Sequence, residues 1–83
     1  MTTLADNPER AQYVEGRIVV HMASGVEISF PVAKNPNFAG ASESQLSNIV
    51  LSPYGLHWPD LDEDLSIRGI TAGDYGQREL DAA

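Results

Sequence analysis

The feature that most constrains the fold is a pattern of apolar residues at every second position, which occurs twice with a short break between. The apolar members are Ile18, Val20 and Met22 in residues 17–22, and Val26, Ile28 and Phe30 in residues 26–31. A period of two is typical of a strand that buries one face. The break contains Gly25, which supplies the positive φ that a short hairpin loop needs. The sequence therefore predicts an antiparallel hairpin.

A second hairpin is predicted from residues 48–51 and 56–58, which flank a Ser-Pro-Tyr-Gly turn. Proline fixes φ at the second position of such a turn, and glycine suits the fourth. Trp58, the only tryptophan, is expected to anchor the core, with His57 on the outer face of the same strand. Because Pro59 has no N–H for a sheet ladder, pairing is expected to end there, and the acidic residues that follow are expected to leave the sheet and be exposed.

Two short helices complete the expected fold. Ser42 and Gln45 form a capping-box pattern, in which each side chain satisfies a backbone N–H of the first turn, and this predicts a helix over residues 42–47. Ser66 is suited to cap a second helix over residues 67–72. The expected class is α+β, a small two-layer domain made of two antiparallel β-hairpins and two short helices.

A single domain is expected over residues 12–73, between a flexible N-terminal arm (residues 1–11) and a frayed C-terminal tail (residues 74–83). The chain has 83 residues, which is close to the size at which one hydrophobic core is just sufficient. The expected core consists of Ile18, Val20, Val26, Ile28, Phe30, Leu46, Ile49, Leu51, Leu56, Trp58, Leu65, Ile67 and Ile70.

The charge balance of the chain argues against one large class of function. A net charge of −7 with only five Lys or Arg argues against direct nucleic-acid binding, because neutralising phosphates supplies most of that affinity. Cysteine is absent, so neither disulfides nor thiolate metal sites hold the fold, and no apolar run reaches the length of a membrane span. We therefore expect a soluble cytoplasmic protein with no membrane association.

Alternate aspartates at positions 60, 62 and 64 resemble the first ligands of a calcium loop of the EF-hand kind, but the match then fails. Counted from Asp60, the sixth place is Leu65 where that loop needs Gly, and the twelfth is Thr71 where it needs Glu. His57 adds too few ligands for a closed zinc site. No metal and no cofactor are therefore predicted.

The D-x-D spacing also has a structural interpretation. Carboxylates beside the free N–H groups at a helix start are favourable, by about 0.5–2 kcal/mol per cap. Asp62 and Asp64 are therefore expected to accept local hydrogen bonds from backbone N–H groups of the turn and of the second helix. No deep pocket is expected to join them to His57.

These features favour a non-catalytic protein–protein interaction module, bound to a protein partner or to a second copy through a sheet edge. The candidate interaction residues are His57, Trp58, Pro59, Asp60, Asp62, Glu63, Asp64 and Ser66. No catalytic residue is assigned, since the nucleophile and phosphate-binding motifs are missing. The alternative is a small metal-dependent or hydrolytic enzyme that uses His57 and the Asp60–Asp64 acidic run.

Taken whole, the run LSPYGLHWPDLDEDLSI at residues 51–67 resembles a bacterial family known as domain of unknown function 2442 (DUF2442). The residues that carry the likeness are Gly55, His57, Trp58, Pro59, Leu61, Asp62, Asp64, Leu65 and Ser66. The upstream hairpin GRIVVHMASGVEISFP is also similar, and the likeness covers roughly residues 12–73. One departure is Gly69-Ile70-Thr71, where relatives often carry a pair of leucines.

The resemblance implies a small α+β fold of two hairpins with helical segments on one side, and it implies no activity. Members of the family are often described beside a second small family of unknown function, number 4160, in an arrangement like a toxin and antitoxin pair. By that analogy, the chain is expected to be the acidic, antitoxin-like half of a two-protein system.

Overall fold

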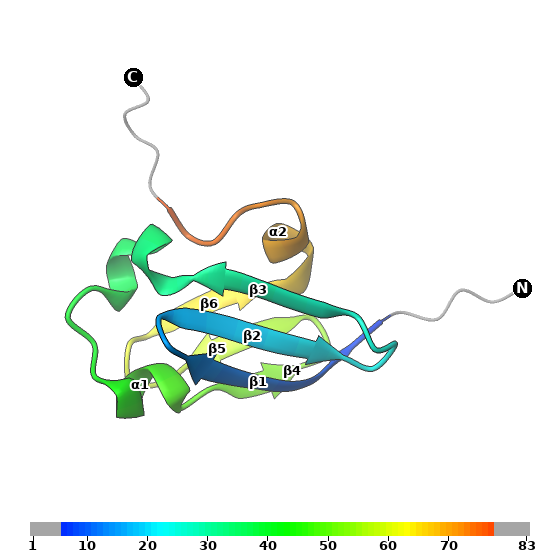
Figure 1. Ribbon diagram of the computed structural model, residues 1–83, viewed down its shortest axis with the longest axis horizontal. Helices are drawn as coiled ribbons and strands as arrows, with labels where there is room; N and C mark the ends of the chain where they lie inside the picture. Colours follow the sequence, from blue (N-terminus) through cyan, green and yellow to red (C-terminus); the bar gives the residue numbers. More distant parts are fainter. Residues whose placement is uncertain (1–5, 78–83) are drawn as a thin grey trace, which may run out of the picture.

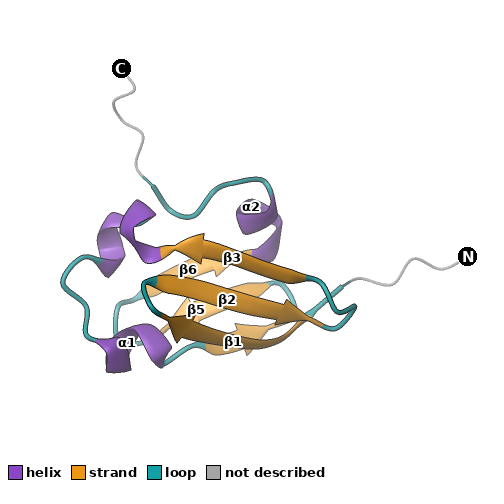
Figure 2. Cartoon of the chain, viewed as in Figure 1, coloured by secondary structure: helices purple, strands orange, loops and turns teal. Residues whose placement is uncertain are grey.

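Two three-stranded antiparallel sheets, stacked as two layers, form most of the structure, a computed structural model that describes residues 6–77 (Figure 1). Sheet A has the order β1-β2-β3, and sheet B has the order β4-β5-β6. The strands are β1 (Pro8–Val14), β2 (Arg17–Met22), β3 (Glu27–Pro31), β4 (Val50–Ser52), β5 (Gly55–Trp58) and β6 (Glu63–Ser66). The helices are α1 (Glu43–Ser47) and α2 (Ile67–Thr71), and two 3-10 turns are η1 (Val32–Lys34) and η2 (Pro36–Phe38). The predicted α+β class, with both hairpins and both helices, is confirmed (Figure 2).

The helices lie at opposite ends of the space between the sheets, instead of on one side of the fold as expected (Figure 1). The capping box of α1 is present, because Ser42 Oγ accepts from Gln45 N at 3.1 Å and Gln45 Oε1 accepts from Ser42 N at 2.9 Å. Ser66 caps α2 by accepting from Gly69 N at 2.8 Å, as predicted. No helix within the described residues is long and apolar enough to cross a membrane.

Strand β1 is a third strand of sheet A that the sequence pattern does not predict. Tyr13 lies directly opposite Ile18, and the whole strand pairs antiparallel with β2. The prediction of a flexible arm over residues 1–11 is therefore wrong for residues 8–11, while residues 1–5 lie outside the described part of the chain. An edge strand with a half-buried inner face needs few apolar residues, so alternation gives only a weak signal here.

Val26 was expected in the core, and this expectation is wrong. The residue is 53% exposed and precedes β3, which begins at Glu27. Its backbone closes the hairpin loop, since Val26 O accepts from Met22 N at 2.8 Å. The alternating pattern therefore included one residue, Val26, that belongs to the turn and not to the strand.

Strand β6 is a third strand of sheet B, and it too is absent from the prediction. Pro59 ends β5 as expected, but the chain then turns back, with Leu61 N donating to Trp58 O at 3.1 Å and Asp62 at a φ of 52°. Glu63 is then opposite Trp58, and β6 pairs antiparallel with β5. The expectation that the acidic residues leave the sheet is therefore wrong after Asp62.

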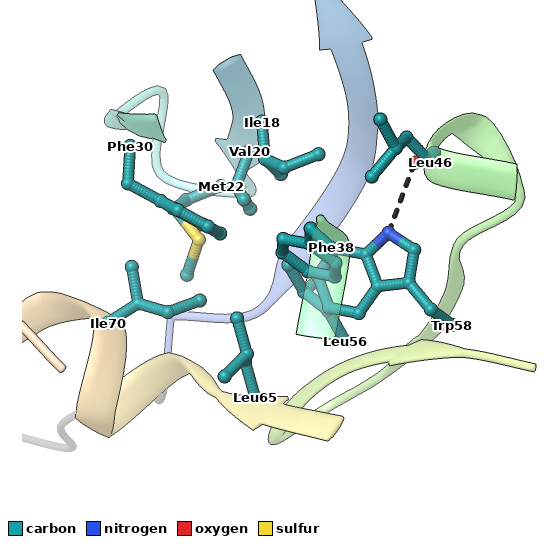
Figure 3. Close-up of a cluster of buried hydrophobic side chains, with 10 residues drawn as sticks. All are labelled: Ile18, Val20, Met22, Phe30, Phe38, Leu46, Leu56, Trp58, Leu65 and Ile70. Atoms are coloured by element: carbon teal, nitrogen blue, oxygen red, sulfur yellow. Dashed lines mark hydrogen bonds between the residues drawn. The ribbon is translucent and has the colours of Figure 1, made fainter. Parts of the chain in front are cut away.

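The core fills the space between the two sheets (Figure 3). The buried residues are Ile18, Val20, Met22, Phe30, Phe38, Leu46, Leu56, Trp58, Leu65 and Ile70. Four other predicted core residues, Ile28, Ile49, Leu51 and Ile67, are partly buried and pack against this cluster. Met22 and Phe38 are additions to the predicted list, and Phe38 comes from η2, which folds over one end of the core.

Trp58 connects three parts of the fold, as expected of the core anchor. The side chain is fully buried, and its ring centroid lies 4.9 Å from that of Phe38. The indole N–H donates to the carbonyl oxygen of Leu46 in α1 at 3.0 Å (Figure 3). This bond satisfies a carbonyl at the end of a short helix, where no intrahelical partner exists.

The segment after α2 folds back onto the core. Tyr75 stacks on Phe30 with ring centroids 5.0 Å apart and an interplanar angle of 6°. The prediction of a frayed tail over residues 74–83 is therefore wrong for residues 74–77, and residues 78–83 lie outside the described part of the chain. Tyr75 gives this polar segment the apolar contact that holds it in place.

We predict that Trp58→Phe costs about 1–3 kcal/mol of unfolding free energy, because the buried carbonyl of Leu46 loses its donor. Trp58→Ala is expected to cost about 3–5 kcal/mol, since it also leaves a cavity between the sheets. Urea denaturation followed by far-UV circular dichroism measures both. Val50→Ala, at a 51% exposed position, is the control and should change stability little. A Trp58→Phe variant as stable as this control would contradict the assigned role of the indole N–H.

Candidate functional site

The register between β5 and β6 divides the acidic run between two faces of sheet B. Glu63 lies opposite Trp58 and so shares its inner side, whereas Asp64 lies opposite His57 on the outer side. Residues that follow one another in sequence are thus separated into an inward group and an outward group. The inward residues face the core, and the outward residues face solvent.

His57 and Asp64 form a pair on the outer side. His57 Nδ1 lies 2.7 Å from Asp64 Oδ1, and the two side chains are 40% and 76% exposed. The predicted outer position of His57 is confirmed by this register. The predicted hydrogen bonds from Asp64 to backbone N–H groups are wrong, because its carboxylate bonds the imidazole across the strands.

The outer side of sheet B consists of two rows of neighbouring residues. One row is Val50, His57 and Asp64, and the other is Ser52, Gly55 and Ser66. Asp60 and Asp62 are exposed in the turn between β5 and β6, and Asp60 Oδ2 accepts from Asn48 Nδ2 at 3.0 Å. Together with this turn, the outer side of sheet B is named the acidic face.

Lys and Arg are absent from the part of the sequence that forms sheet B. The Lys and Arg residues are Arg10, Arg17, Lys34, Arg68 and Arg78, so none occurs between positions 35 and 67. Sheet B and α1 therefore contain no Lys or Arg side chain. Arg10 and Arg17 lie in sheet A, where Arg10 is opposite His21. Sheet A also contains Glu9 and Glu27, so it carries charges of both signs, whereas sheet B carries carboxylates without Lys or Arg.

Glu63 belongs to a polar cluster on the inner side. Its Oε2 accepts from Asn35 Nδ2 at 2.9 Å, and its Oε1 accepts from Asn37 Nδ2 at 2.7 Å. Asn35 is only 1% exposed, and its Oδ1 accepts from Asn37 N at 2.8 Å. The expectation that every carboxylate of the run is exposed is therefore wrong for Glu63, which ties sheet B to η2.

No sequence signal identifies Asn35 and Asn37 as partners of Glu63. The pairs are separated by 28 and 26 residues, and Asn in a Pro- and Gly-containing loop is ordinary turn chemistry. Their contact depends on the inward direction of Glu63, which in turn depends on the existence of β6.

Gly76 covers this cluster. A Cβ atom at Gly76 would meet Asn35 Nδ2 and Glu63 Oε2, and the residue has a φ of 88°. Gly73 has a similar φ of 94° but open space where a Cβ would lie. The backbone of residues 74–77 therefore fits closely against the cluster, and no side chain can be placed there without displacing it.

The remaining predicted site residues lie in the core, at a helix cap or at the end of a strand. Trp58 is buried, Ser66 caps α2, and Pro59 is exposed at the end of β5. In the described part of the chain, no three His, Asp or Glu side chains converge closely enough to hold a metal ion. His57 and the aspartates of the acidic run therefore present an open surface, with a carboxylate-oriented imidazole on it.

Outside the acidic run, the residues that the structure describes form two shallow hollows that adjoin the ends of α2. One, of about 440 Å³, is lined by Asp6, Pro53, Tyr54, Ser66, Ile67 and Arg68. The other, of about 260 Å³, is lined by Ala72, Gly73, Asp74 and Gln77. His57 lines neither of them.

A family model described as "Protein of unknown function (DUF2442)" matches residues 8–76. The chain belongs to this family. The suspected resemblance is confirmed, and the match includes β1 and the segment that follows α2. No curated protein matches the chain.

Two solved structures resemble this DUF2442 domain. A protein of unknown function from Rhodospirillum rubrum is 34% identical, with a TM-score of 0.78 over 88% of this chain and 93% of the other. An uncharacterized protein from Chromobacterium violaceum is 29% identical, with a TM-score of 0.77 over 92% of this chain and 73% of the other. Both support the fold, and neither has a described activity.

We predict that Glu63→Ala destabilises the fold by about 1–3 kcal/mol, because the buried amide of Asn35 loses its acceptor. Glu9→Ala, at an exposed position in β1, is the matched control and should change stability by less than about 0.5 kcal/mol. Urea denaturation gives both values. Equal stability of the two variants would mean that the inward direction of Glu63 contributes nothing to the fold.

A comparison of two glycines tests the close fit of the C-terminal segment. Gly73→Ala is expected to cost about 1–2 kcal/mol, because an L-residue is strained at positive φ. Gly76→Ala should cost clearly more, because the same strain is joined by the contact with Asn35 and Glu63. Thermal unfolding of both variants measures the difference, and equal losses would show that residues 74–77 do not pack on the cluster in solution.

Proposed function

We propose that this DUF2442 protein is a non-catalytic interaction module whose acidic face binds a basic region of another protein. The observation that carries the proposal is that sheet B and the turn between β5 and β6 carry carboxylates and no Lys or Arg, whereas sheet A carries charges of both signs. Asp64 in β6 and Asp60 and Asp62 in the turn before it are exposed, and no Lys or Arg occurs between positions 35 and 67 of the sequence. A face of one sign steers an oppositely charged partner and rejects others.

The inward residues strengthen this argument by contrast. Trp58, Glu63 and Leu65 are accounted for by the core and by the polar cluster. Asp64 and His57 form an exposed cross-strand pair, and such a pair contributes at most about 1 kcal/mol to the free energy of unfolding. Folding alone therefore gives little reason for the outward carboxylates, whereas binding does.

The proposed binding surface is a face of sheet B, whereas the sequence suggested a sheet edge. The edge strand β1 contains Pro8 and a register irregularity between Pro8 and Arg10. The edge strand β6 carries the charged residues Glu63 and Asp64. Proline, bulges and charges are the devices by which edges resist the addition of another strand.

An acidic module of this kind suits the antitoxin-like half of a two-protein system, which the family resemblance implied. The proposal includes a cytoplasmic location, because both members of such a pair meet inside the cell. It requires no cofactor and no contact with nucleic acid.

One observation favours a second candidate, a small hydrolytic enzyme. A carboxylate 2.7 Å from His57 Nδ1 fixes the orientation of the ring, which is how many general-base histidines are held. Catalysis also needs a concave site in which substrate is held, and His57 lies on an open strand surface outside both hollows. The interaction module is therefore the better supported function.

The test uses two variants with the same loss of charge. Asp60→Asn/Asp62→Asn/Asp64→Asn neutralises the acidic face, while Glu9→Gln/Glu15→Gln/Glu27→Gln removes three charges from sheet A. Proteins captured from the source organism by the tagged wild type are purified, and their affinities for all three forms are measured by calorimetry over a range of salt. The face variant is expected to bind about tenfold more weakly, since three exposed ion pairs at about 0.5 kcal/mol each give that factor.

The control variant should bind like the wild type, and wild-type affinity should fall as salt rises. The captured partner should carry a net positive region. A partner that binds the face variant and the wild type equally well, or an acidic partner, would contradict the proposal. Loss of a measured hydrolytic activity in His57→Ala, with binding unchanged, would favour the enzyme instead.

A further inference from the structure

The larger hollow adjoins the acidic face. Its lining includes Ser66, which also belongs to the outer row Ser52, Gly55 and Ser66 of sheet B. The lining residues come from the start of the described chain, the β4–β5 turn and the start of α2. In Figure 1, α2 lies at the end of the molecule away from α1. A ligand that lies along the acidic face therefore reaches this hollow without leaving the surface.

The walls of the hollow are suited to an apolar side chain. Pro53, Tyr54 and Ile67 supply apolar surface, and Tyr54 is 81% exposed. Asp6 and Arg68 place one negative and one positive group on the lining, so the hollow carries no net charge of its own. Tyrosine and arginine are also the residue types that most often dominate binding energy at the centre of an interface.

Hydrogen bonds donated by backbone N–H groups hold the hollow in shape. Ser52 Oγ accepts from Tyr54 N at 3.3 Å and from Gly55 N at 3.1 Å, which fixes the turn. Ile67 N donates to Tyr54 O at 2.8 Å, which joins the turn to the start of α2. A Cβ at Gly55 would meet the backbone of the neighbouring strand, so glycine permits this close approach. A preformed site loses less entropy when it is filled.

We propose that this hollow is the anchor point for the basic partner, and that it takes one large apolar side chain from a segment whose Lys or Arg residues lie on the acidic face. The inference rests on the proposed function and specifies the partner segment: basic residues with one aromatic or large aliphatic residue at a fixed offset. The acidic face then sets the rate and salt dependence of binding, and the hollow sets most of its strength. A volume of about 440 Å³ is ample for one such side chain.

The probe is a phage-displayed library of random dodecapeptides, selected on the immobilised full-length protein. The selected peptides are expected to be basic and to share one large apolar residue. The best peptide is synthesised with a fluorescent label, and its affinity is measured by anisotropy for the wild type, Tyr54→Ala, Asp60→Asn/Asp62→Asn/Asp64→Asn and Val26→Ala. Val26 is the matched control, because it is 53% exposed in the other hairpin loop. Circular dichroism confirms that each variant is folded.

Tyr54→Ala is expected to weaken binding about 30-fold or more, the size of a hot-spot effect, without changing the salt dependence. The triple variant should weaken binding less and flatten the salt dependence, and Val26→Ala should change neither. Replacing the apolar residue of the peptide by Ala should cost the wild type as much as Tyr54→Ala does, and should cost the Tyr54→Ala variant little more. Such non-additivity shows that the two groups touch.

The outcomes separate the anchor from the function on which it rests. If the triple variant loses affinity while Tyr54→Ala binds like the wild type, the anchor is wrong and the acidic face stands. If selection yields no basic peptides, both fail. Binding that appears only after removal of residues 1–5, or self-association that Tyr54→Ala abolishes in sedimentation, would assign the hollow to the protein itself and overturn the proposal.

Discussion

The buried side chain of Trp58 joins sheet B, η2 and α1 and fixes which residues of β5 face the core. Neither sheet can bury its inner face alone, and the indole fills the space between them while its N–H bonds the carbonyl of Leu46. Because Trp58 must point inward, its neighbour His57 must point outward. Because Glu63 lies opposite Trp58 and Asp64 lies opposite His57, Glu63 points inward and Asp64 points outward. The inward direction of this one buried ring thus determines which members of the acidic run face the core and which face outward.

This division changes how a run of acidic residues should be interpreted. Glu63 is held by two asparagine amides on the inner side, and removing it would leave a buried donor unpaired. Asp64 has an exposed histidine as its partner and could be neutralised with little effect on folding. Adjacent carboxylates therefore have separate roles. A mutational study that removes them together would combine a stability effect with the effect on the proposed binding.

Local patterns in the sequence were enough to predict much of the fold. The two hairpins, the capping box at Ser42 and the buried position of Trp58 all follow from short-range chemistry, namely period-two alternation, turn residues and N-caps. The strands β1 and β6 do not, because an edge strand with one half-buried face can be built from polar residues. Pro59 was correctly interpreted as the end of a strand, but nothing in the sequence shows that Asp62 adopts a positive φ and returns the chain to the sheet.

The candidate site was predicted less completely for a related reason. The outward direction of His57 follows from its position next to Trp58, so it could be predicted. Asn35, Asn37 and the hollow beside Tyr54 arise from segments far apart in the sequence, and their contacts depend on strands that the pattern does not show. Contacts between segments far apart in the sequence therefore could not be predicted from the residues alone.

The most direct test of the account is chemical-shift mapping of the isotope-labelled protein as a basic binding peptide is added. The account predicts that backbone amide shifts change at Asp6 and over residues 50–57 and 60–68, which include the acidic face and the hollow, while those of β2 and β3 stay constant. Changes centred on sheet A, where Arg10 and Arg17 lie, would contradict the claim that sheet B is the binding side of the molecule.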